Sequence, residues 1–422
     1  MSRRIHASYW IETAFPVAEA AEALAGEQSS GTFITLPGET PELKARSGAV
    51  VEHIEDLEQV SEPSLPGAAV PKQHLSATWQ RAKIEVSWPL ENMGPSLPNL
   101  AATITGNLFE LKQFSGLRLL DLRLPDAFRD RYGGPQFGVE GTRRLAGVPK
   151  LPLIGTIVKP SVGLTPAETA AMVKQLAEGG LDFIKDDELQ ADGPHCPFAE
   201  RVGDVMRVLR DHADRTGKMV MFAFNLTGEI DEMRRRHDLV VEAGGTCVMA
   251  SMHSIGLTGM TALRAHSRLP IHLHRNGWGL FARSPYIGVS YTAWQKLWRL
   301  AGADHMHVNG IRNKFCEPDE SVVASARECL TPMFEGDGRG CEVMPVFSSG
   351  QWGGQAFDTY AALGSANLIH AAGGGIMGHP GGIAAGAAGM RAAWEGALAG
   401  LSADETAAES LEFRQAREQF GP

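Results

Sequence analysis

The chain has 422 residues, enough for two or three domains or for one large α/β barrel with a smaller attached domain. Its hydrophobic fraction of 43% and charged fraction of 21% are typical of a globular protein and exclude a disordered or fibrous chain. A net charge of -10 without a basic cluster argues against a nucleic-acid partner, because phosphate backbones are bound mainly by Lys and Arg.

Targeting and redox signals point to a cytoplasmic protein. The sequence has no apolar run of the roughly 18 residues that a membrane span needs, and Met1-Ser2-Arg3-Arg4 is not followed by the apolar core of a signal peptide. We therefore expect a cytoplasmic location without a membrane partner. The 5 cysteines contain no CxxC pair, so we expect them to be reduced, with neither disulfides nor a structural zinc site.

Residues 1–140 are expected to form a smaller α+β domain. Turn-rich segments such as residues 61–71 occur there beside short runs of alternating polarity such as residues 82–86. A period of two residues is typical of strands with one buried face. The composition changes between residues 135 and 150, where we place the boundary to a second domain over residues 141–422.

The second domain is predicted to be a (β/α)8 TIM barrel. Short apolar runs alternate there with helix-like stretches, as a parallel sheet with crossover helices requires. Eight such runs begin near Pro152, Leu181, Met219, Thr246, Pro270, Asp304, Val343 and Asn367. Their starts lie roughly 24 to 39 residues apart, the length of one strand, loop and helix of such a barrel.

Two helices of this domain have clear signals. Thr165 and Glu168 form a capping box around Pro166 at the first helical position, and Gly179-Gly180 predicts the end of that helix. Residues 383–399 are rich in Ala and Gly and are also predicted to be helical, followed by a charged tail.

Polar residues at the ends of five runs predict an active site, because the catalytic groups of these barrels lie at the carboxyl ends of the strands. The ends are Lys159, residues 185–188, residues 272–275, residues 305–307 and residues 348–350. A single strand-end lysine is more often a surface residue. Five polar ends together indicate a common site.

Residues 185–188, Lys-Asp-Asp-Glu, suggest a magnesium site. Alternation along the strand points Lys185 and Asp187 to the same side, and Glu188 turns inward as the strand ends. Carboxylate oxygens suit Mg²⁺, although a solvated charged loop would have the same spacing. The alternative is a zinc or iron site at His272, His274, His305 and His307. No carboxylate lies among these histidines, which favours phosphate binding or proton transfer, with His272 and His305 structural.

Glycines after the eighth run predict a phosphate site. Gly373-Gly374-Gly375 follows the last strand, where barrels commonly bind a phosphate with backbone N–H groups. A lone triplet of glycines can also be a simple turn. Ser349-Gly350 after the neighbouring seventh run favours the phosphate interpretation.

In these motifs the chain resembles the large subunit of RuBisCO and the RuBisCO-like proteins, over nearly its whole length. The resemblance implies a (β/α)8 barrel behind a ferredoxin-like α+β domain. It also implies that Lys185 is carbamylated by CO₂ and binds Mg²⁺ together with Asp187 and Glu188. The other implied roles are proton transfer by Lys159, binding of the substrate backbone and one terminal phosphate by His274, Arg275, His307, Ser349 and Gly350, binding of the second phosphate by Gly373 and Gly374, and a loop lysine, Lys314, that reaches over the substrate.

The smaller domain resembles the same family. Glu27, Thr32 and Asn107 match residues that the family contributes to the active site of the neighbouring subunit. The resemblance therefore implies a homodimer with shared active sites.

Departures from the carboxylase pattern change the expected reaction. Phe33 replaces a Trp, Ile157 a Thr, Ser161 a Lys and Gln351 a Gly. Loss of the lysine at Ser161 removes a cation near the reacting carbons. We expect an enzyme that forms an enolate from a phosphorylated keto sugar or keto sugar acid with an anion at each end. The preferred reaction is decarboxylation or C–C bond hydrolysis of a 3-oxo sugar-acid phosphate such as 3-oxo-isoapionate 4-phosphate.

Three alternatives remain open at the level of sequence. A methionine-salvage enolase or isomerase would act on substrates with an uncharged sulfur end, which fits two anion sites less well. A ribulose-bisphosphate carboxylase would need a substitute for the missing lysine. A non-catalytic binding protein would not need Lys159, Lys185, Asp187 and Glu188 at strand ends.

Overall fold

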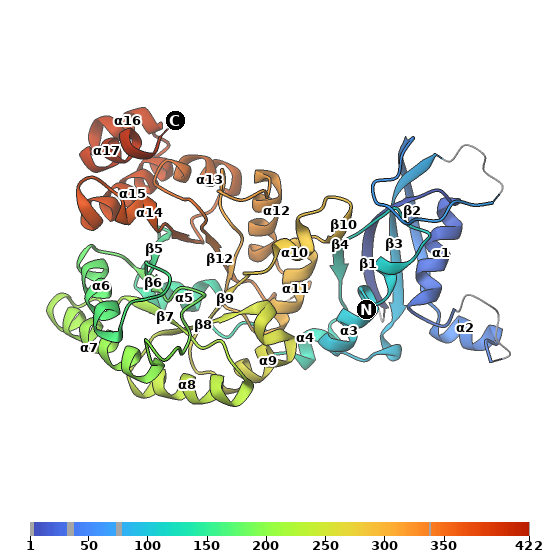
Figure 1. Cartoon of the computed structure of the whole chain (residues 1–422), viewed down its shortest axis with the longest axis horizontal. Coiled ribbons are helices and arrows are strands. Elements are labelled where there is room, and N and C mark those ends of the chain that lie inside the picture. Colours follow the sequence, from blue (N-terminus) through green and yellow to red (C-terminus); the bar gives the residue numbers. More distant parts are fainter. Residues whose placement is uncertain (1–3, 32–37, 73–77, 337–338, 422) are drawn as a thin grey trace. The chain divides into compact units, whose positions relative to one another are not determined.

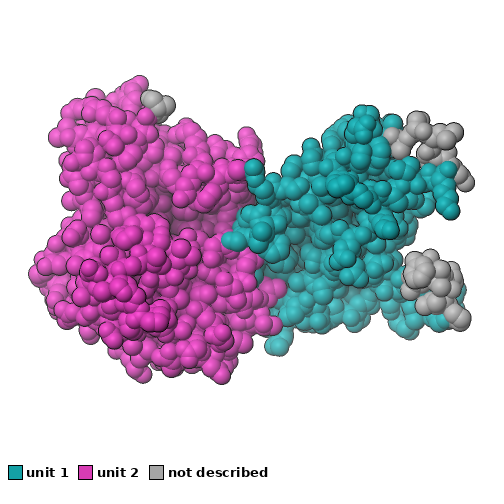
Figure 2. Space-filling view, viewed as in Figure 1, with its two compact units in different colours: residues 1–133, 277–300, 333–340 teal, residues 134–276, 301–332, 341–422 magenta. Residues whose placement is uncertain are grey.

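The chain divides into two compact units (Figure 2). The structure, a computed structural model, describes residues 4–31, 38–72, 78–336 and 339–421. Unit 1 comprises residues 1–133, 277–300 and 333–340, and unit 2 comprises residues 134–276, 301–332 and 341–422.

Unit 2 contains a closed barrel of eight parallel strands (Figure 1). They are β5 (Leu153–Ile157), β6 (Phe183–Lys185), β7 (Met221–Asn225), β8 (Cys247–Ser251), β9 (Ile271–His274), β11 (His305–His307), β12 (Met344–Phe347) and β13 (Ile369–Ala371). Each lies in one of the eight predicted apolar runs. The predicted (β/α)8 barrel is confirmed.

Apolar side chains from different strands fill the barrel interior. Leu153, Phe183, Met249, Met344 and Ile369 belong to one buried cluster. Both faces of a parallel barrel are covered, so its strands appear in the sequence as continuous apolar runs. This property explains why short runs were sufficient to locate the strands.

Helices of unit 2 surround the barrel (Figure 1). They are α5 (Gly138–Ala146), α6 (Pro166–Glu178), α7 (Phe198–Thr216), α8 (Ile230–Glu242), α9 (Met252–His266), α12 (Asp319–Leu330), α13 (Gln355–Leu363), α14 (Gly374–Met377) and α15 (Gly382–Ala399). The predicted capping box of α6 is present: Glu168 N–H donates to Thr165 Oγ1, and Thr165 N–H donates to Glu168 Oε2. None of the described helices is both long and apolar enough to cross a membrane.

The charged tail folds into two further helices that the sequence analysis did not predict. These are α16 (Ala403–Glu409) and α17 (Leu411–Phe420). Ser402 and Glu405 form a capping box at the start of α16, and this signal was available in the sequence. Phe413 of α17 is fully buried, so the tail contributes to the core.

Unit 1 is built on a five-stranded mixed sheet of order β10-β4-β1-β3-β2. The strands are β1 (Arg4–Thr13), β2 (Val50–Val60), β3 (Trp79–Pro89), β4 (Gly116–Arg123) and β10 (Ile287–Val289), and the helices include α1 (Val17–Glu27), α2 (Pro41–Ser47), α3 (Leu97–Ile104) and α4 (Ala127–Arg131). The first four strands with α1 and α3 follow the β-α-β-β-α-β order of a ferredoxin-like fold, as expected.

The fifth strand of this sheet comes from much later in the chain. β10 pairs with β4 in parallel, and it lies between α10 (Gly279–Ala282) and α11 (Tyr291–Ala301). Lys296 of α11 donates to Asp121 Oδ1 at 2.6 Å and to Leu122 O at 2.8 Å, which attaches α11 to β4. No local pattern indicated this pairing, because its partners are far apart in sequence.

Candidate active site

Five of the predicted site residues come together at the carboxyl ends of β5, β6 and β9, namely Lys159, Lys185, Asp187, Glu188 and His274. Lys159 Nζ donates to Asp187 Oδ2 at 2.6 Å. Lys185 Nζ donates to Glu188 Oε2 at 3.2 Å, and His274 Nε2 lies 3.5 Å from the same oxygen. Two lysines, two carboxylates and one imidazole therefore form a single cluster, as the sequence analysis predicted.

Lys185 has an environment that favours its neutral amine. Its side chain is 1% exposed. Burial lowers the pKa of Lys185, although the carboxylates of Glu188 and Asp187 act in the opposite direction. An amine reacts with CO₂ only in its neutral form, so the lowered pKa increases the fraction that can become a carbamate.

The imidazole of His274 is neutral and has a defined tautomer. Burial, followed by the charge of Lys185, lowers the pKa of His274 to about 4. The N–H of Asn276 donates to His274 Nδ1 at 3.1 Å, which places the ring proton on Nε2, the atom that faces Glu188. Burial alone would raise the pKa of Glu188, but His274 and Lys185 together lower it to about 2. Glu188 is therefore a carboxylate at neutral pH.

The donor set of this cluster fits Mg²⁺ if Lys185 carries a carbamate. Asp187 and Glu188 supply carboxylate oxygens, the ligands that a hard divalent cation prefers. With Lys185 as an ammonium, the third group in the cluster would repel a cation. A carbamate would replace that positive charge by oxygen donors, so Lys185, Asp187 and Glu188 could then hold Mg²⁺ together with water molecules.

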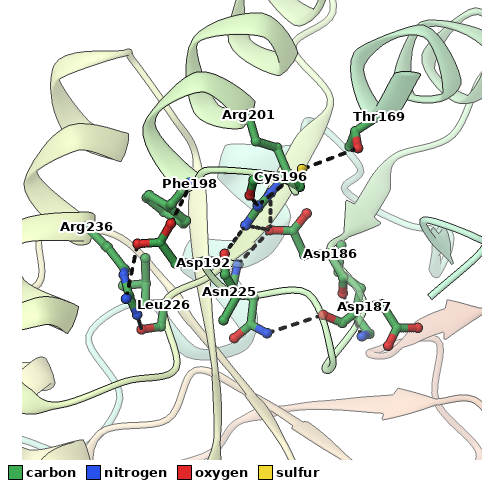
Figure 3. Close-up of polar contacts among 12 residues, drawn as sticks. Thr169, Asp186, Asp187, Asp192, Cys196, Phe198, Arg201, Asn225, Leu226 and Arg236 are labelled. Atoms are coloured by element: carbon green, nitrogen blue, oxygen red, sulfur yellow. Dashed lines mark hydrogen bonds and ion pairs between the residues drawn. The ribbon is translucent and has the colours of Figure 1, made fainter. Parts of the chain in front are cut away.

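Asp186, next to Asp187 in the chain, belongs to a buried polar network with Arg201 and Asn225 (Figure 3). Its Oδ2 accepts from Arg201 Nε at 3.3 Å and Nη2 at 3.2 Å, and both side chains are fully buried. Burial alone would lower the pKa of Arg201, but the carboxylate of Asp186 raises it. Arg201 also donates to the carbonyls of Ala191 and Cys196, and so holds the loop that follows Glu188.

Asn225 is a site residue that the sequence analysis missed. It is the last residue of β7, and its Nδ2 donates to the carbonyl of Asp187 at 3.2 Å (Figure 3) and to the carbonyl of Glu188 at 3.3 Å. Its backbone N–H donates to Asp186 at 2.9 Å. Asn225 thus fixes the backbone of both expected metal ligands. The signal that could have identified it is the one used for the other strands, a polar residue at the end of an apolar run.

The histidines of β9 and β11 form a buried row. His272 Nε2 and His307 Nε2 are 2.7 Å apart, and burial lowers the pKa of both rings well below its usual value. His307 Nδ1 lies 3.0 Å from Ser348 Oγ. His305 is fully buried against Thr142. The neutral rings of His272 and His305 pack in the barrel interior, in agreement with a structural role.

Arg275 and Ser349, expected to bind a phosphate, both contact the loop that follows β11. Arg275 forms an ion pair with Glu317. Ser349 Oγ donates to Asn309 Oδ1 at 3.0 Å, and Ser349 O accepts from Lys314 N–H at 3.2 Å. The structure therefore brings Arg275 and Ser349 to the loop of Lys314, with further contacts from Glu317 and Asn309, which the sequence analysis did not name.

Gly373 and Gly374, the glycines expected to bind a phosphate, have open space beside their Cα atoms. Gly373 precedes α14 and Gly374 begins it, and a Cβ atom would meet nothing closer than 4.0 Å at Gly373 and nothing within 4 Å at Gly374. No packing contact requires glycine at these two positions, so a ligand can approach their backbone N–H groups closely.

Gly350 has a φ of +79°, a left-handed conformation that favours glycine. The exposed Lys314 places its Nζ 5.3 Å from the centre of the Phe315 ring.

The expected site residues of the smaller domain lie in unit 1. Glu27 is the last residue of α1, and Asn107 precedes a 3₁₀ turn at Leu108–Glu110. Both side chains are exposed. Thr32 and Phe33 lie outside the described residues.

A second group of possible metal ligands among the described residues lies on α8 and α9, with His237, Asp238 and His266. The N–H of Arg268 donates to His237 Nε2 at 3.1 Å, so the neutral ring carries its proton on Nδ1, 3.0 Å from Asp238 Oδ1. A histidine that binds a metal uses an unprotonated nitrogen and donates through the other. This group is therefore a hydrogen-bonded triad rather than a metal site.

Comparison with known proteins identifies the family. Residues 4–128 match the N-terminal domain and residues 138–420 the catalytic domain of the ribulose bisphosphate carboxylase large chain. Over 416 residues the chain is 58% identical to a 3-oxo-isoapionate-4-phosphate transcarboxylase/hydrolase of Xanthobacter autotrophicus, covering 99% of each chain. It is 44% identical to a 3-oxo-isoapionate-4-phosphate decarboxylase of Rhizobium etli, covering 98% of each.

The solved structures agree. A RuBisCO-like protein from Burkholderia fungorum superposes with a TM-score of 0.92 at 46% identity, over 98% of this chain and 99% of that one. Both domains of the family are thus present, in the expected order and with the expected folds. The chain belongs to the RuBisCO large-chain family.

Proposed function

We propose that the protein is a magnesium-dependent enzyme that forms an enolate from 3-oxo-isoapionate 4-phosphate or a closely similar 3-oxo sugar-acid phosphate. The observation that carries this proposal is the cluster of Lys159, Lys185, Asp187 and Glu188, in a chain 58% identical to a transcarboxylase/hydrolase of that substrate. The cluster supplies the groups that a carbamate and a divalent cation need, together with an acid or base beside them.

The residues of the cluster have distinct roles in the proposed reaction. The carbamate of Lys185, with Asp187 and Glu188, would hold Mg²⁺, which supplies an electrophile for the charge that develops on the keto oxygen. The bond between the carboxyl carbon and its neighbour breaks, and its electron pair becomes the enolate. Lys159, an ammonium beside Asp187, is placed to donate a proton to the enolate carbon. His274 directs its Nε2–H into the same site, where it can donate to a substrate oxygen.

The fate of the released CO₂ separates two reactions. In a decarboxylase the enolate takes a proton and the CO₂ departs. In a transcarboxylase/hydrolase the CO₂ adds to another carbon of the enolate, and water then cleaves a C–C bond. We favour the second outcome, because the identity is 58% to the relative with that name and 44% to the decarboxylase.

A substrate labelled with ¹³C in its carboxyl group tests this choice. NMR of the reaction with Mg²⁺ and bicarbonate should show the label in the carboxylate of a cleaved product. Label released as CO₂ and bicarbonate would instead identify a decarboxylase. Unchanged substrate would contradict the proposal as a whole.

We also infer a homodimer with active sites shared between subunits. This inference rests on Glu27, Thr32 and Asn107, which match residues that the family places in the neighbouring subunit's site. It implies that the isolated barrel is an incomplete enzyme.

A further inference from the structure

Glu317, in the loop after β11, forms an ion pair with Arg275, the arginine that is expected to bind a phosphate. Glu317 Oε2 forms an ion pair with Arg275 Nη2 and accepts from Asn309 Nδ2 at 2.7 Å. Glu317 Oε1 accepts from Ser321 Oγ at 2.9 Å. The side chains of Arg275 and Glu317 are 5% and 14% exposed. Donors from three residues therefore hold this carboxylate in place.

The same loop contacts the other expected phosphate ligand. Asn309 bridges the two, because it donates to Glu317 and its Oδ1 accepts from Ser349 Oγ. The N–H of Lys314 donates to Ser349 O. Residues 309–317 thus contact both groups that an anion of the substrate would use.

We propose that Glu317 is a specificity-determining residue, which competes with the substrate's anion for Arg275. A phosphate carries a charge of about -2 and three acceptor oxygens, so it can replace a single carboxylate on a guanidinium. A carboxylate offers no more charge than Glu317 itself, and an uncharged group offers none. Glu317 therefore makes the Arg275 end of the site selective for a phosphate over a carboxylate or an uncharged group.

This selection orients the substrate. The inference rests on the proposed function, in which the substrate carries one phosphate and one carboxylate. The phosphate displaces Glu317 at Arg275, and the carboxylate is directed to the end formed by Gly373 and Gly374. Because Glu317 belongs to the loop that carries Lys314, occupation of Arg275 also changes how that loop is held.

Binding of inorganic phosphate to the full chain tests the competition. Isothermal titration calorimetry compares the wild type, Glu317→Gln and Glu320→Gln, an exposed glutamate on the same loop-to-helix segment that provides the same change in net charge. We expect Glu317→Gln to bind phosphate about tenfold more tightly, because a negative charge beside the anion is removed, and Glu320→Gln to match the wild type. Equal or weaker binding by Glu317→Gln would overturn the proposal.

Acetate provides a second measurement, and Glu317→Ala a second variant. Without Glu317, a monoanion no longer has to displace a carboxylate, so the ratio of phosphate to acetate affinity should fall in both variants. A ratio that stays constant or rises would overturn the proposal. Neither titration involves turnover, so a failure here is distinct from a failure of the enzyme to convert 3-oxo-isoapionate 4-phosphate.

Discussion

Lys159 Nζ lies 2.6 Å from Asp187 Oδ2 and 2.8 Å from Ser161 Oγ, so the expected proton donor is in contact with an expected metal ligand. In the carboxylases a second lysine occupies the position of Ser161, and here a hydroxyl accepts from Lys159 instead. At these two positions the chain therefore has one lysine where the carboxylases have two, and that lysine, Lys159, forms an ion pair with Asp187.

Replacement of this lysine separates proton transfer from metal binding. Lys159→Met should reduce turnover by about 10²- to 10⁴-fold, because a positioned acid or base is lost. Mg²⁺ binding should be retained or tightened, because an ammonium that neutralises Asp187 is removed. Steady-state kinetics and Mg²⁺ titration measure the two effects. The exposed Lys174 on α6 provides a matched control, Lys174→Met, and equal losses in both variants would contradict the assignment.

Loss of the Asn225 amide should weaken the metal site without unfolding the barrel. Asn225→Ala removes the two hydrogen bonds to the carbonyls of Asp187 and Glu188. Removing a residue that orients metal ligands typically costs about 10- to 100-fold in metal affinity. Mg²⁺ titration in the presence of bicarbonate measures the effect, with the exposed Asn99→Ala as control. Unchanged Mg²⁺ affinity in Asn225→Ala would show that the backbone is fixed by other contacts.

Mixed dimers test the shared active site. Asn107→Ala and Lys185→Ala should each be inactive alone. If each site combines the smaller domain of one subunit with the barrel of the other, random mixing leaves half of the dimers mixed, each with one intact site. Activity should then return to about a quarter of the wild-type value. No recovery after verified subunit exchange would contradict sharing.

Buried histidines should make the fold sensitive to acid. Burial lowers the pKa of His305 to about 3. Between that value and the ordinary value of 6.5, the unfolded chain binds a proton that the folded chain does not. Stability should therefore fall as the pH decreases from 6.5 towards 3, by at most about 1.4 kcal/mol per pH unit for one such histidine. Urea unfolding at several pH values should show a smaller slope in His305→Asn.

Local sequence patterns were sufficient for the barrel and for most of its strand-end residues. The strands lie in buried apolar runs, and Lys185 and Asp187 follow directly from strand alternation at the end of β6. Helix α6 was located by the capping box of Thr165 and Glu168, which is itself a local arrangement.

Features that depend on distant contacts could not be read in this way. β10 pairs with β4 although the paired residues Leu117 and Ile287 lie 170 residues apart in the sequence, and Glu317 reaches Arg275 from a different loop. Neither contact has a local signature, since each depends on the folded arrangement of separate segments. Asn225 differs, because it ends an apolar run and could have been identified by the same rule as Lys159.

Solvent exchange tests the enolate most directly. The enzyme is incubated in D₂O with Mg²⁺, bicarbonate and 3-oxo-isoapionate 4-phosphate, and NMR follows deuterium in the products of the wild type and of Lys185→Ala. In the products of the wild type we predict deuterium at the former enolate carbon. In Lys185→Ala the rate of turnover should fall by at least about a thousandfold, because the metal site is removed. Turnover without deuterium incorporation, or full activity in Lys185→Ala, would contradict enolate chemistry at a carbamate-dependent site.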